Sequence, residues 1–426
     1  MNVTSKPHLH QDWVDPHAVG IVRALQKREF TTYLVGGCVR DLLLGIHPKD
    51  YDIATNAQPD QVKRTIHRAY VIGKRFRLVL VRRDEQQFEV ATFRRELTAE
   101  EMGSEDAPAG DNMFGTPEED ARRRDFTING LFYDPINDQL IDFAEGLPDL
   151  ENRIIRMIGE PVRRLKEDPI RILRALRLKH MIEFTFDADL RKAMMETAPT
   201  LLTTALPRRR EEILKWLRLR KPVLAFQEAF DLEILKVLTP TLHEALQNED
   251  AAEVFFSYLR QIPYDNQLSP VDLFGILVLA FTRAFLQPDP VVTTRAHDPL
   301  AAESVQKWMR DELGMFKFEQ ALVAKALHVE PLLGKRREFQ KKGERRQRAL
   351  LMNDAFPLAL RYAGLDYFLG CEDAFYWNER FAQVKDQIGD GGGREGGGSR
   401  RRRPRRRRPR GSKPRTENAS SEASST

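Results

Sequence analysis

The hydrophobic pattern of the chain changes near Leu150, and this change restricts the possible folds more than any other feature of the sequence. Before that point, short runs rich in β-branched and aromatic residues are separated by glycines and polar turns, as is typical of strands. From Leu150 to about Gln387, apolar residues recur every three or four positions without sustained alternation, which predicts helices. The sequence therefore predicts an α+β chain, with an N-terminal mixed sheet followed by an all-helical part.

The strand-like runs lie before the change of pattern. They predict strands at Thr32–Val35, Tyr51–Thr55 and Gln139–Phe143, and a hairpin that pairs Phe76–Arg82 with Gln87–Phe93. A short helix is expected over Val39–Leu44, and residues 98–115 are polar enough to predict a mobile loop. Thr116 opens a capping-box sequence with proline at the first helical position, so a helix is expected from there through Arg122 to Asn129.

Composition divides the chain further and excludes some classes of protein. Residues 389–426 carry 12 Lys or Arg against 4 Asp or Glu, whereas the rest carries 56 basic against 59 acidic residues. This terminal segment lacks large apolar side chains and is predicted to be a disordered Arg-rich tail. No apolar stretch reaches the roughly 18 residues of a membrane span or forms a signal-peptide core, so a cytoplasmic protein is expected. Cys38 and Cys371 are too few for a disulfide framework or a zinc site, and each is predicted to be a packed hydrophobe.

Three carboxylates are candidates for metal binding. Asp50 and Asp52 are two positions apart, so on a strand both side chains point to one face while Tyr51 and Ile53 point to the core. Glu89 occupies the polar face of the predicted hairpin strand and could point toward the aspartates. Paired carboxylates suit Mg²⁺, although a solvated turn would give the same Asp-x-Asp pattern.

The glycine pair between the first strand and the following helix is a candidate phosphate site. Without side chains, Gly36 and Gly37 would let backbone amides approach a triphosphate. Arg40 is placed to reach a phosphate, and Asp41 suits the positive start of a helix.

Four motifs in order, YLVGGCVRDLLLG, KDYDIAT, FEVATFR and RRRDFTING, resemble the class II nucleotidyltransferase superfamily, which contains bacterial poly(A) polymerases and CCA-adding enzymes. The resemblance covers Tyr33 to Lys215. It implies a polymerase-β-like sheet, two Mg²⁺ ions on Asp50 and Asp52 with Glu89 as the third carboxylate, and ATP as substrate. The implied chemistry is in-line attack of an RNA 3′-hydroxyl on the ATP α-phosphorus, for which no histidine base is required.

The same resemblance assigns roles to polar residues beyond the carboxylates. Arg124, Asp125 and Asn129 match the family motif that contacts the sugar and the triphosphate, although these residues alone would favour a solvated basic helix face. Asp168 and Arg171 match the EDxxR element that selects ATP and CTP. A carboxylate acceptor beside an arginine donor fits the Watson–Crick edges of adenine and cytosine equally well.

Three residues on one face of a predicted helix complete the base pocket that the resemblance implies. Arg208, Glu212 and Lys215 match the family's RxxxExxK element, although packing salt bridges would produce the same spacing. An exposed ion pair is likewise the alternative for Asp168 and Arg171.

The resemblance also gives the expected domains their functions. We expect a leader (1–25), a nucleotidyltransferase head (26–148), a helical neck that recognises the base (149–222), an RNA-binding helical body (223–388) and the tail (389–426). The body aromatics Phe226, Phe230, Phe255, Phe256 and Tyr258 are predicted to be core, and the lone pair His297-Asp298 does not predict a metal phosphohydrolase.

Three features favour a poly(A) polymerase over a CCA-adding enzyme. Residues 71–78 and 111–116 are similar to segments of bacterial poly(A) polymerases, and the tail sequence RRRRPRRRRPR predicts sequence-blind contact with RNA phosphates. The expected activity is polyadenylation of the 3′ ends of mRNA and other transcripts by a monomer. Three alternatives remain: a CCA-adding enzyme, an RNA-binding adaptor with an inactive head, and a tail that only aids solubility or docks an acidic partner.

Overall fold

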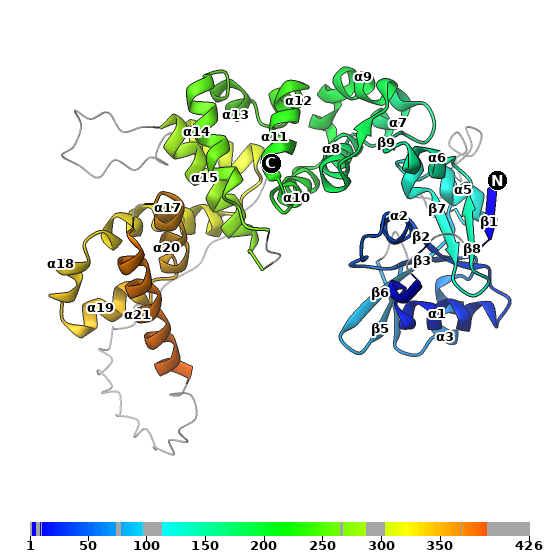
Figure 1. The fold of residues 1–426 in the computed structure, drawn as a ribbon, viewed down its shortest axis with the longest axis horizontal. Coiled ribbons are helices and arrows are strands. Elements are labelled where there is room, and N and C mark those ends of the chain that lie inside the picture. The colour runs from blue at the N-terminus through cyan, green and yellow to red at the C-terminus, as the bar shows by residue number, and fades with distance from the viewer. Residues whose placement is uncertain are drawn as a thin grey trace, which may run out of the picture.

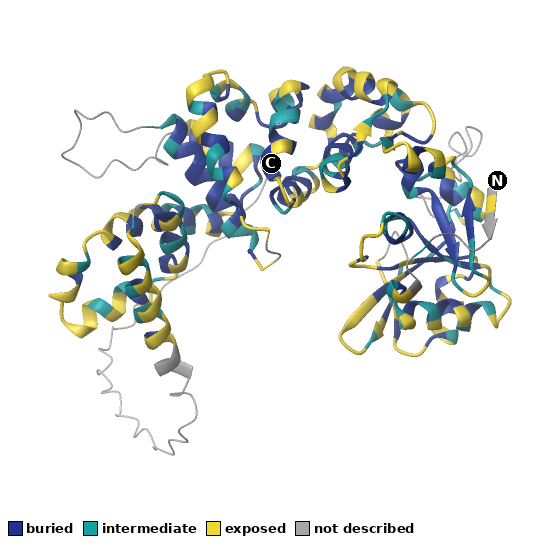
Figure 2. Cartoon of the chain, viewed as in Figure 1, coloured by how far each residue is buried: buried dark blue, intermediate teal, exposed yellow. Residues whose placement is uncertain are grey.

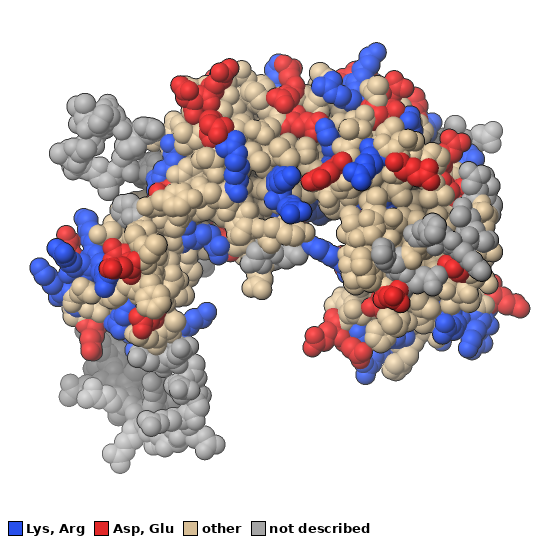
Figure 3. Space-filling view, in the orientation of Figure 1, with Lys and Arg blue, Asp and Glu red and all other residues tan. Residues whose placement is uncertain are grey.

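The chain forms an arch (Figure 1), and a space-filling view shows a hollow between its two ends (Figure 3). The computed structural model describes residues 2–5, 9, 11–73, 78–96, 113–264, 267–286, 303–367 and 369–389. The head, which carries the large sheet, lies at one end of the arch, and helices make up most of the top and the other end. The predicted α+β fold, with a sheet followed by helices, is confirmed.

The head is built on one mixed sheet. Its strands are β1 (Asn2–Ser5), β2 (Thr32–Val35), β3 (Asp52–Thr55), β4 (Ala69–Ile72), β5 (Leu78–Arg83), β6 (Gln86–Thr92), β7 (Leu131–Asp134) and β8 (Gln139–Asp142). Their order across the sheet is β1-β8-β7-β2-β3-β6-β5-β4. Strand β3 runs parallel to β6, and the other described neighbours in this sheet are antiparallel. The predicted hairpin is present as β5 and β6, with Asp84 and Glu85 in its turn.

The two faces of this sheet are packed unequally. On one face, Ile53 and Val90 join a large core with α1 (Pro16–Gln26) and α3 (Pro59–Thr65). On the other face, Ala54 and Phe93 belong to a small core that is capped by α5 (Pro117–Arg122). Asp52 and Glu89 share this second face because they lie two positions before Ala54 and Ala91 on their strands. On this face, Asp52 and Glu89 are exposed, whereas Ala54 and Phe93 are buried.

The structure corrects two expectations about the head. Residues 1–25 are more than a leader, because they supply the edge strand β1 and most of helix α1. The helix that begins at Thr116 ends at Arg122 instead of continuing to Asn129, and Thr127–Asn129 form a 3-10 turn. Backbone hydrogen bonds explain this early end, because Thr127 N–H donates to Arg156 and Ile158 N–H donates to Asp125, which pulls the chain into an extended pairing.

Beyond the head, the described residues are mainly helical apart from the short pair β9 (Ile154–Ile155) and β10 (Thr185–Phe186), which the sequence reading missed. Helices α2 (Gly37–Leu43) and α6 (Gly146–Glu151) belong to the head region. The others are α7 (Pro161–Glu167), α8 (Ile170–Ile182), α9 (Ala188–Thr197), α10 (Leu206–Leu217), α11 (Pro222–Asp231), α12 (Ile234–Leu238), α13 (Pro240–Ala245), α14 (Glu249–Arg260), α15 (Pro270–Phe285), α16 (Glu303–Lys307), α17 (Lys317–Leu333), α18 (Arg336–Gln340), α19 (Glu344–Leu351), α20 (Phe356–Leu365) and α21 (Cys371–Gly389).

Burial follows the apolar spacing along these helices (Figure 2). Phe226, Phe255 and Phe256 are buried as expected, and Phe230 and Tyr258 pack against the same core. Cys38 is buried, but Cys371 is exposed, so the prediction of a packed thiol was wrong for Cys371.

Some expectations concern residues outside the described part of the chain. They include most of the predicted loop 98–115, His297-Asp298 and residues 390–426 of the tail. Within the described ranges, no helix is both long and apolar enough to cross a membrane.

Candidate active site

The register between β3 and β6 brings two of the candidate carboxylates together. Asp52 begins β3 and is the direct partner of Glu89 on the parallel strand β6. Neighbouring strands are about 4.8 Å apart, so the two side chains leave the same face side by side. Tyr51 and Ile53 are buried, as predicted, whereas Asp50 lies two residues before Asp52 and is exposed. All three carboxylates thus lie around the start of β3, an interior strand of the sheet.

The carboxylates repel one another. Partial burial raises the pKa of the Glu89 carboxyl, and the charges of Asp52 and Asp50 raise it further. Burial also raises the pKa of Asp52; the Arg124 guanidinium acts to lower this pKa, and Asp50 acts to raise it. A divalent cation would relieve this repulsion, and hard oxygen ligands are what Mg²⁺ prefers. The donor set therefore fits a metal, although within the described ranges no three His, Cys, Asp or Glu side chains are grouped closely enough to hold one by themselves.

A cavity of about 1050 Å³ opens beside these carboxylates. Gly36, Gly37, Asp50 and Asp52 line it from the head, residues of α8 and α10 line it from the neck, and Tyr264 lines it from the body. Glu89 is not among the lining residues. Figure 3 shows that the head and the helical part face each other across the hollow of the arch. The lining includes ten Lys or Arg and five Asp, so the cavity carries a positive balance that suits a polyphosphate.

The glycine turn adopts a backbone that a side chain would disfavour. Gly36 precedes α2 with φ +76°, and a Cβ at this position would lie 2.7 Å from Nη1 of Arg124. Its N–H, however, donates to the carbonyl of Leu131 at 3.1 Å. The Gly36 amide is therefore engaged within the fold, which corrects the expectation that both glycine amides face a phosphate.

Arg40 is held more tightly than the sequence suggested. It is 5% exposed, and its guanidinium donates to Asp41 at 2.6 Å and to Oδ1 of Asn129 at 2.6 Å. Because α2 begins at Gly37, Asp41 lies beyond the first turn, so the argument from the positive helix start does not apply to it. Asn129 thereby links α2 to the turn after α5.

The residues of the RRDFTIN segment form two ion pairs that face the cavity. Arg124 pairs with Asp120 at 3.0 Å, and its guanidinium lies 5.3 Å from the Phe132 ring centroid. Asp125 is buried and accepts two hydrogen bonds from Arg174, at 2.6 and 2.9 Å. Burial acts to raise the pKa of Asp125, but the charge of Arg174 and the Asn129 amide hold that pKa well below its usual range.

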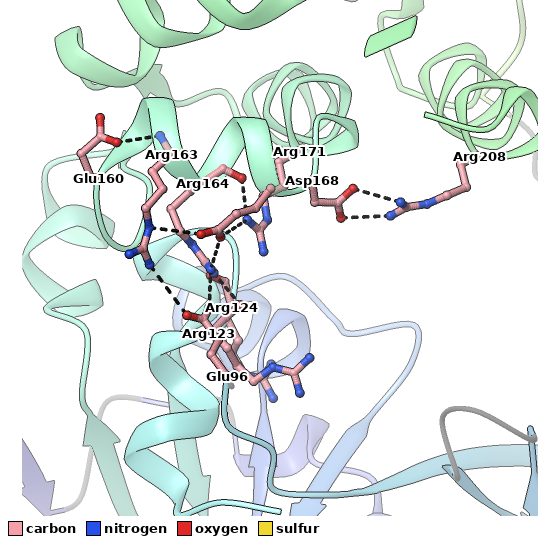
Figure 4. A network of polar contacts seen from close by, with 10 residues as sticks. Glu96, Arg123, Arg124, Glu160, Arg163, Arg164, Asp168, Arg171 and Arg208 are labelled. Carbon is pink, nitrogen blue, oxygen red and sulfur yellow. Dashed lines mark hydrogen bonds and ion pairs between the residues drawn. The ribbon is translucent and has the colours of Figure 1, made fainter. Parts of the chain in front are cut away.

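The neck residues expected to read the base are close to one another but are paired differently from the prediction (Figure 4). Asp168 caps the end of α7 instead of sharing a helix with Arg171, which lies on α8. Its carboxylate binds the Arg208 guanidinium through two bonds of 2.9 and 3.0 Å. Arg171 donates to the carbonyl of Arg164 at 2.6 Å. All three predicted residues, Asp168, Arg171 and Arg208, line the cavity.

Glu212 and Lys215, the other two predicted residues of α10, form a packing salt bridge, and Lys215 also lines the cavity. Glu212 is buried and binds Arg177 at 2.9 Å and Lys215 at 2.8 Å. Burial acts to raise the pKa of Glu212, but Arg177 and Lys215 lower it overall. Arg177 and Lys215 line the cavity, so the packing salt bridge also orients two cationic side chains toward it.

Sequence reasoning missed several arginines of the neck. Arg164 is buried on α7 and donates to the carbonyls of Arg123 and Arg124, at 2.7 and 3.0 Å, and so joins the neck to the head. Arg174 and Arg177 follow Arg171 at intervals of three on α8, a spacing that puts cations on neighbouring parts of one helix face. This repeat directly after EDPIR was a visible signal, whereas the link made by Arg164 depends on tertiary contacts.

Comparison with known proteins places the chain among nucleotidyltransferases. Residues 32–156 match the family model of the poly A polymerase head domain, and residues 183–246 match the model of the probable RNA and SrmB-binding site of polymerase A. A CCA-adding enzyme from Bacillus licheniformis is 31% identical over 312 residues, which are 72% of this chain and 76% of that protein. The chain belongs to the nucleotidyltransferase family that contains bacterial poly(A) polymerases and CCA-adding enzymes.

The chain is also similar to a poly(A) polymerase in sequence and to a CCA-adding enzyme in fold. A poly(A) polymerase I from Haemophilus influenzae is 38% identical over 233 residues, or 53% of this chain and 52% of that protein. The chain thus spans about half the length of the curated poly(A) polymerases that it matches. The crystal structure of a Bacillus stearothermophilus CCA-adding enzyme in complex with CTP superimposes with a TM-score of 0.63 at 22% identity, covering 88% of this chain and 84% of that chain, which shows the same fold.

Proposed function

We propose that this chain is a template-independent RNA adenylyltransferase, a poly(A) polymerase that adds AMP from ATP to RNA 3′ ends. The observation that carries the proposal is the pairing of Asp52 with Glu89, close to Asp50, beside a cavity that the two aspartates line and whose charged lining is mainly basic. Such a site combines ligands for divalent cations with counter-charges for a triphosphate.

The carboxylates take the role of metal ligands in this proposal. Asp50, Asp52 and Glu89 would hold two Mg²⁺ ions, with triphosphate oxygens completing the coordination. When bound, the ions supply a lowered pKa at the attacking 3′-hydroxyl and neutralise the charge that develops on pyrophosphate. The protein itself contributes by holding the two substrates in line.

The arginines take the role of triphosphate ligands. The Arg124 guanidinium lies next to Gly36, and its charge acts to lower the pKa of Asp52. A phosphate bound between the glycine turn and the carboxylates would therefore lie close to Arg124. Arg40, Asp125 and Asn129 are already hydrogen-bonded to other side chains of this chain. These bonds support a role in positioning the site, in addition to direct contact with the nucleotide. With the Gly36 amide engaged, backbone contact with a phosphate would begin at Gly37.

The neck takes the role of base selection. Asp168 would accept from the exocyclic amine of adenine, and Arg171 would donate to the adjacent ring nitrogen. Because Arg208 occupies the Asp168 carboxylate in the structure, its guanidinium would share that carboxylate or move when a base binds. Glu212 would keep Lys215 in place beside them.

The choice of a poly(A) polymerase rests on the 38% identity to poly(A) polymerase I and on the Arg-rich tail sequence. A cation-rich segment gives affinity for many transcripts without reading their sequence. We extend the proposal to mRNA polyadenylation in the cytoplasm by a monomer. The second candidate is a CCA-adding enzyme, which is favoured by the more complete match to the Bacillus licheniformis protein.

One incorporation assay separates the two candidates. Purified protein is incubated with Mg²⁺ and with ATP, CTP or both, on a generic transcript and on a tRNA that lacks CCA. Long A tails on both RNAs support the proposal, whereas CCA additions confined to the tRNA would replace it with the second candidate. If neither RNA is extended, and Asp50→Ala preserves cellular function while deletion of residues 390–426 abolishes it, the chain is an RNA-binding adaptor.

A further inference from the structure

Tyr264 is the contribution of the body to the cavity. The other residues that line the cavity lie between positions 36 and 220, in the head and the neck, whereas Tyr264 follows α14. The residue is 62% exposed. The other lining residue with a phenyl ring, Phe126, is 1% exposed. Tyr264 therefore offers the cavity an aromatic face that a ligand can cover.

The ring of Tyr264 lies against the head. Nζ of Lys49 is 5.8 Å from its centroid, and Lys49 directly precedes the candidate metal ligand Asp50. This contact brings residues more than 200 positions apart to the carboxylate side of the cavity. The Lys49 ammonium therefore lies within cation–π range of the ring and adds a positive charge beside it.

The cavity also has an apolar part in its lining. Leu178, Met181 and Ile182 from α8 and Leu219 after α10 contribute it, and Met181 is 40% exposed. The groups that can read the edge of a base, Asp168 and Arg171, belong to the neck. The lining thus contains a polar edge-reading set and an aromatic face, which suit two different nucleosides.

We propose that Tyr264 stacks on the base of the 3′-terminal nucleotide of the RNA. The inference rests on the proposed function, because that reaction requires an RNA end and a nucleoside triphosphate in one cavity. A growing or variable 3′ end needs sequence-tolerant binding, and stacking on an aromatic ring provides it because every base has a π-face. The triphosphate nucleoside, by contrast, must be selected by its edge, which the ring face of Tyr264 cannot read. The Lys49 contact sets the stacked nucleotide beside Asp50, where its 3′-hydroxyl reacts.

The test compares Tyr264→Ala and Tyr264→Phe in the full-length protein. The probe is an oligoadenylate whose 3′-terminal nucleotide is either intact or abasic, at an ionic strength high enough to weaken phosphate contacts. We expect Tyr264→Ala to raise KM for the intact RNA about 5- to 150-fold, as for the loss of one stacked base, with KM for ATP unchanged. Tyr264→Phe should retain the wild-type KM because it keeps the ring.

The abasic probe isolates the stacking interaction. On this RNA, wild-type protein and Tyr264→Ala should have the same KM, since neither can stack on a base. Tyr367→Ala is the matched control, because Tyr367 is 81% exposed and does not line the cavity. The inference is overturned if Tyr264→Ala changes KM for ATP instead, or if its penalty persists on the abasic RNA.

Direct binding keeps the inference separate from the proposed function. Fluorescence anisotropy with the labelled oligoadenylate and no ATP measures Kd without any transfer. If wild-type protein binds but does not extend the RNA, the proposed function fails. The Kd values of the same variants on the intact and abasic probes still decide the role of Tyr264.

Discussion

A buried ion pair joins the cavity-lining neck helix α10 to the body, and its loss should destabilise the protein. Nη2 of Arg210 lies 2.6 Å from Oε1 of Glu319 at the start of α17, and the two side chains are 6% and 2% exposed. The guanidinium also lies 5.2 Å from the Phe274 ring centroid and 4.6 Å from that of Phe316. Arg210 thus sits between aromatic rings, with Glu319 as its buried counter-ion.

The change Arg210→Met should cost about 3–5 kcal/mol, because it leaves the Glu319 carboxylate buried without a charge partner. The other oxygen of that carboxylate keeps only the backbone N–H of Phe316, at 2.7 Å. For a cooperative unit of roughly 200 residues, this cost corresponds to a fall in Tm of about 6–20 °C. Tryptophan fluorescence during a thermal scan measures this fall, since Trp216, Trp308 and Trp377 are fully buried.

Two further variants make this prediction specific. Arg310→Met removes an ion pair with Asp311 whose side chains are 60% and 44% exposed, so its Tm should equal that of the wild type within error. The double variant Arg210→Met with Glu319→Gln removes both charges and should lose less than the sum of the two single variants. The reasoning is refuted if Arg210→Met shifts Tm no more than Arg310→Met, or if the two single losses simply add.

Three other predictions follow from the site, the body and the tail. Asp52→Asn should lower nucleotide incorporation by more than roughly 10–100-fold, which is the usual cost of losing a residue that only orients a metal ligand. In the wild type, the Mg²⁺ concentration needed for half-maximal rate should rise as pH falls, because Asp52 and Glu89 have raised pKa values and must be deprotonated to bind metal. Burial and a hydrogen bond to Asp366 raise the pKa of Glu330 to about 7, so the folded state binds this proton more tightly than the unfolded state does. The free energy of unfolding should therefore fall as pH rises from about 4.3 to about 7. Thermal scans at several pH values should show this fall in Tm, and Glu330→Gln should reduce it. Deleting residues 390–426 removes 12 Lys or Arg, and filter binding should then show a shallower salt dependence, by about 0.7 in the slope of log affinity against log salt for each RNA phosphate that the tail had neutralised.

Local patterns predicted much of the head. Strand β2, of which three residues are buried, was predictable as a short buried run that the glycine pair ends. The β5–β6 hairpin was predictable because its alternation reflects which side chains meet water, and this is a property of neighbouring residues. The same alternation gave the facing of Tyr51 and Glu89 correctly. Strand β7 (Leu131–Asp134) escaped prediction because all four residues are buried, so its sequence shows no alternation, and because it directly follows a segment that was expected to be helical as far as Asn129.

Pairings between distant residues were beyond the reach of local patterns. The early end of α5 depends on backbone hydrogen bonds from Ile158 to Asp125 and from Thr127 to Arg156, which no helix propensity encodes. The partner of Asp168 is Arg208, on a different helix, although Arg171 was the obvious choice by spacing.

The sequence by itself determined the chemistry that the chain can offer: which residues are acidic, basic or free of side chains, and on which face of a strand or helix they project. Only the tertiary structure decided which of these groups meet. The register of β3 against β6 sets Glu89 beside Asp52, and the approach of the body to the head sets the Lys49 ammonium over the Tyr264 ring. The physical reason is range, since side-chain facing follows from local backbone geometry, whereas convergence depends on how whole layers pack after long loops have closed.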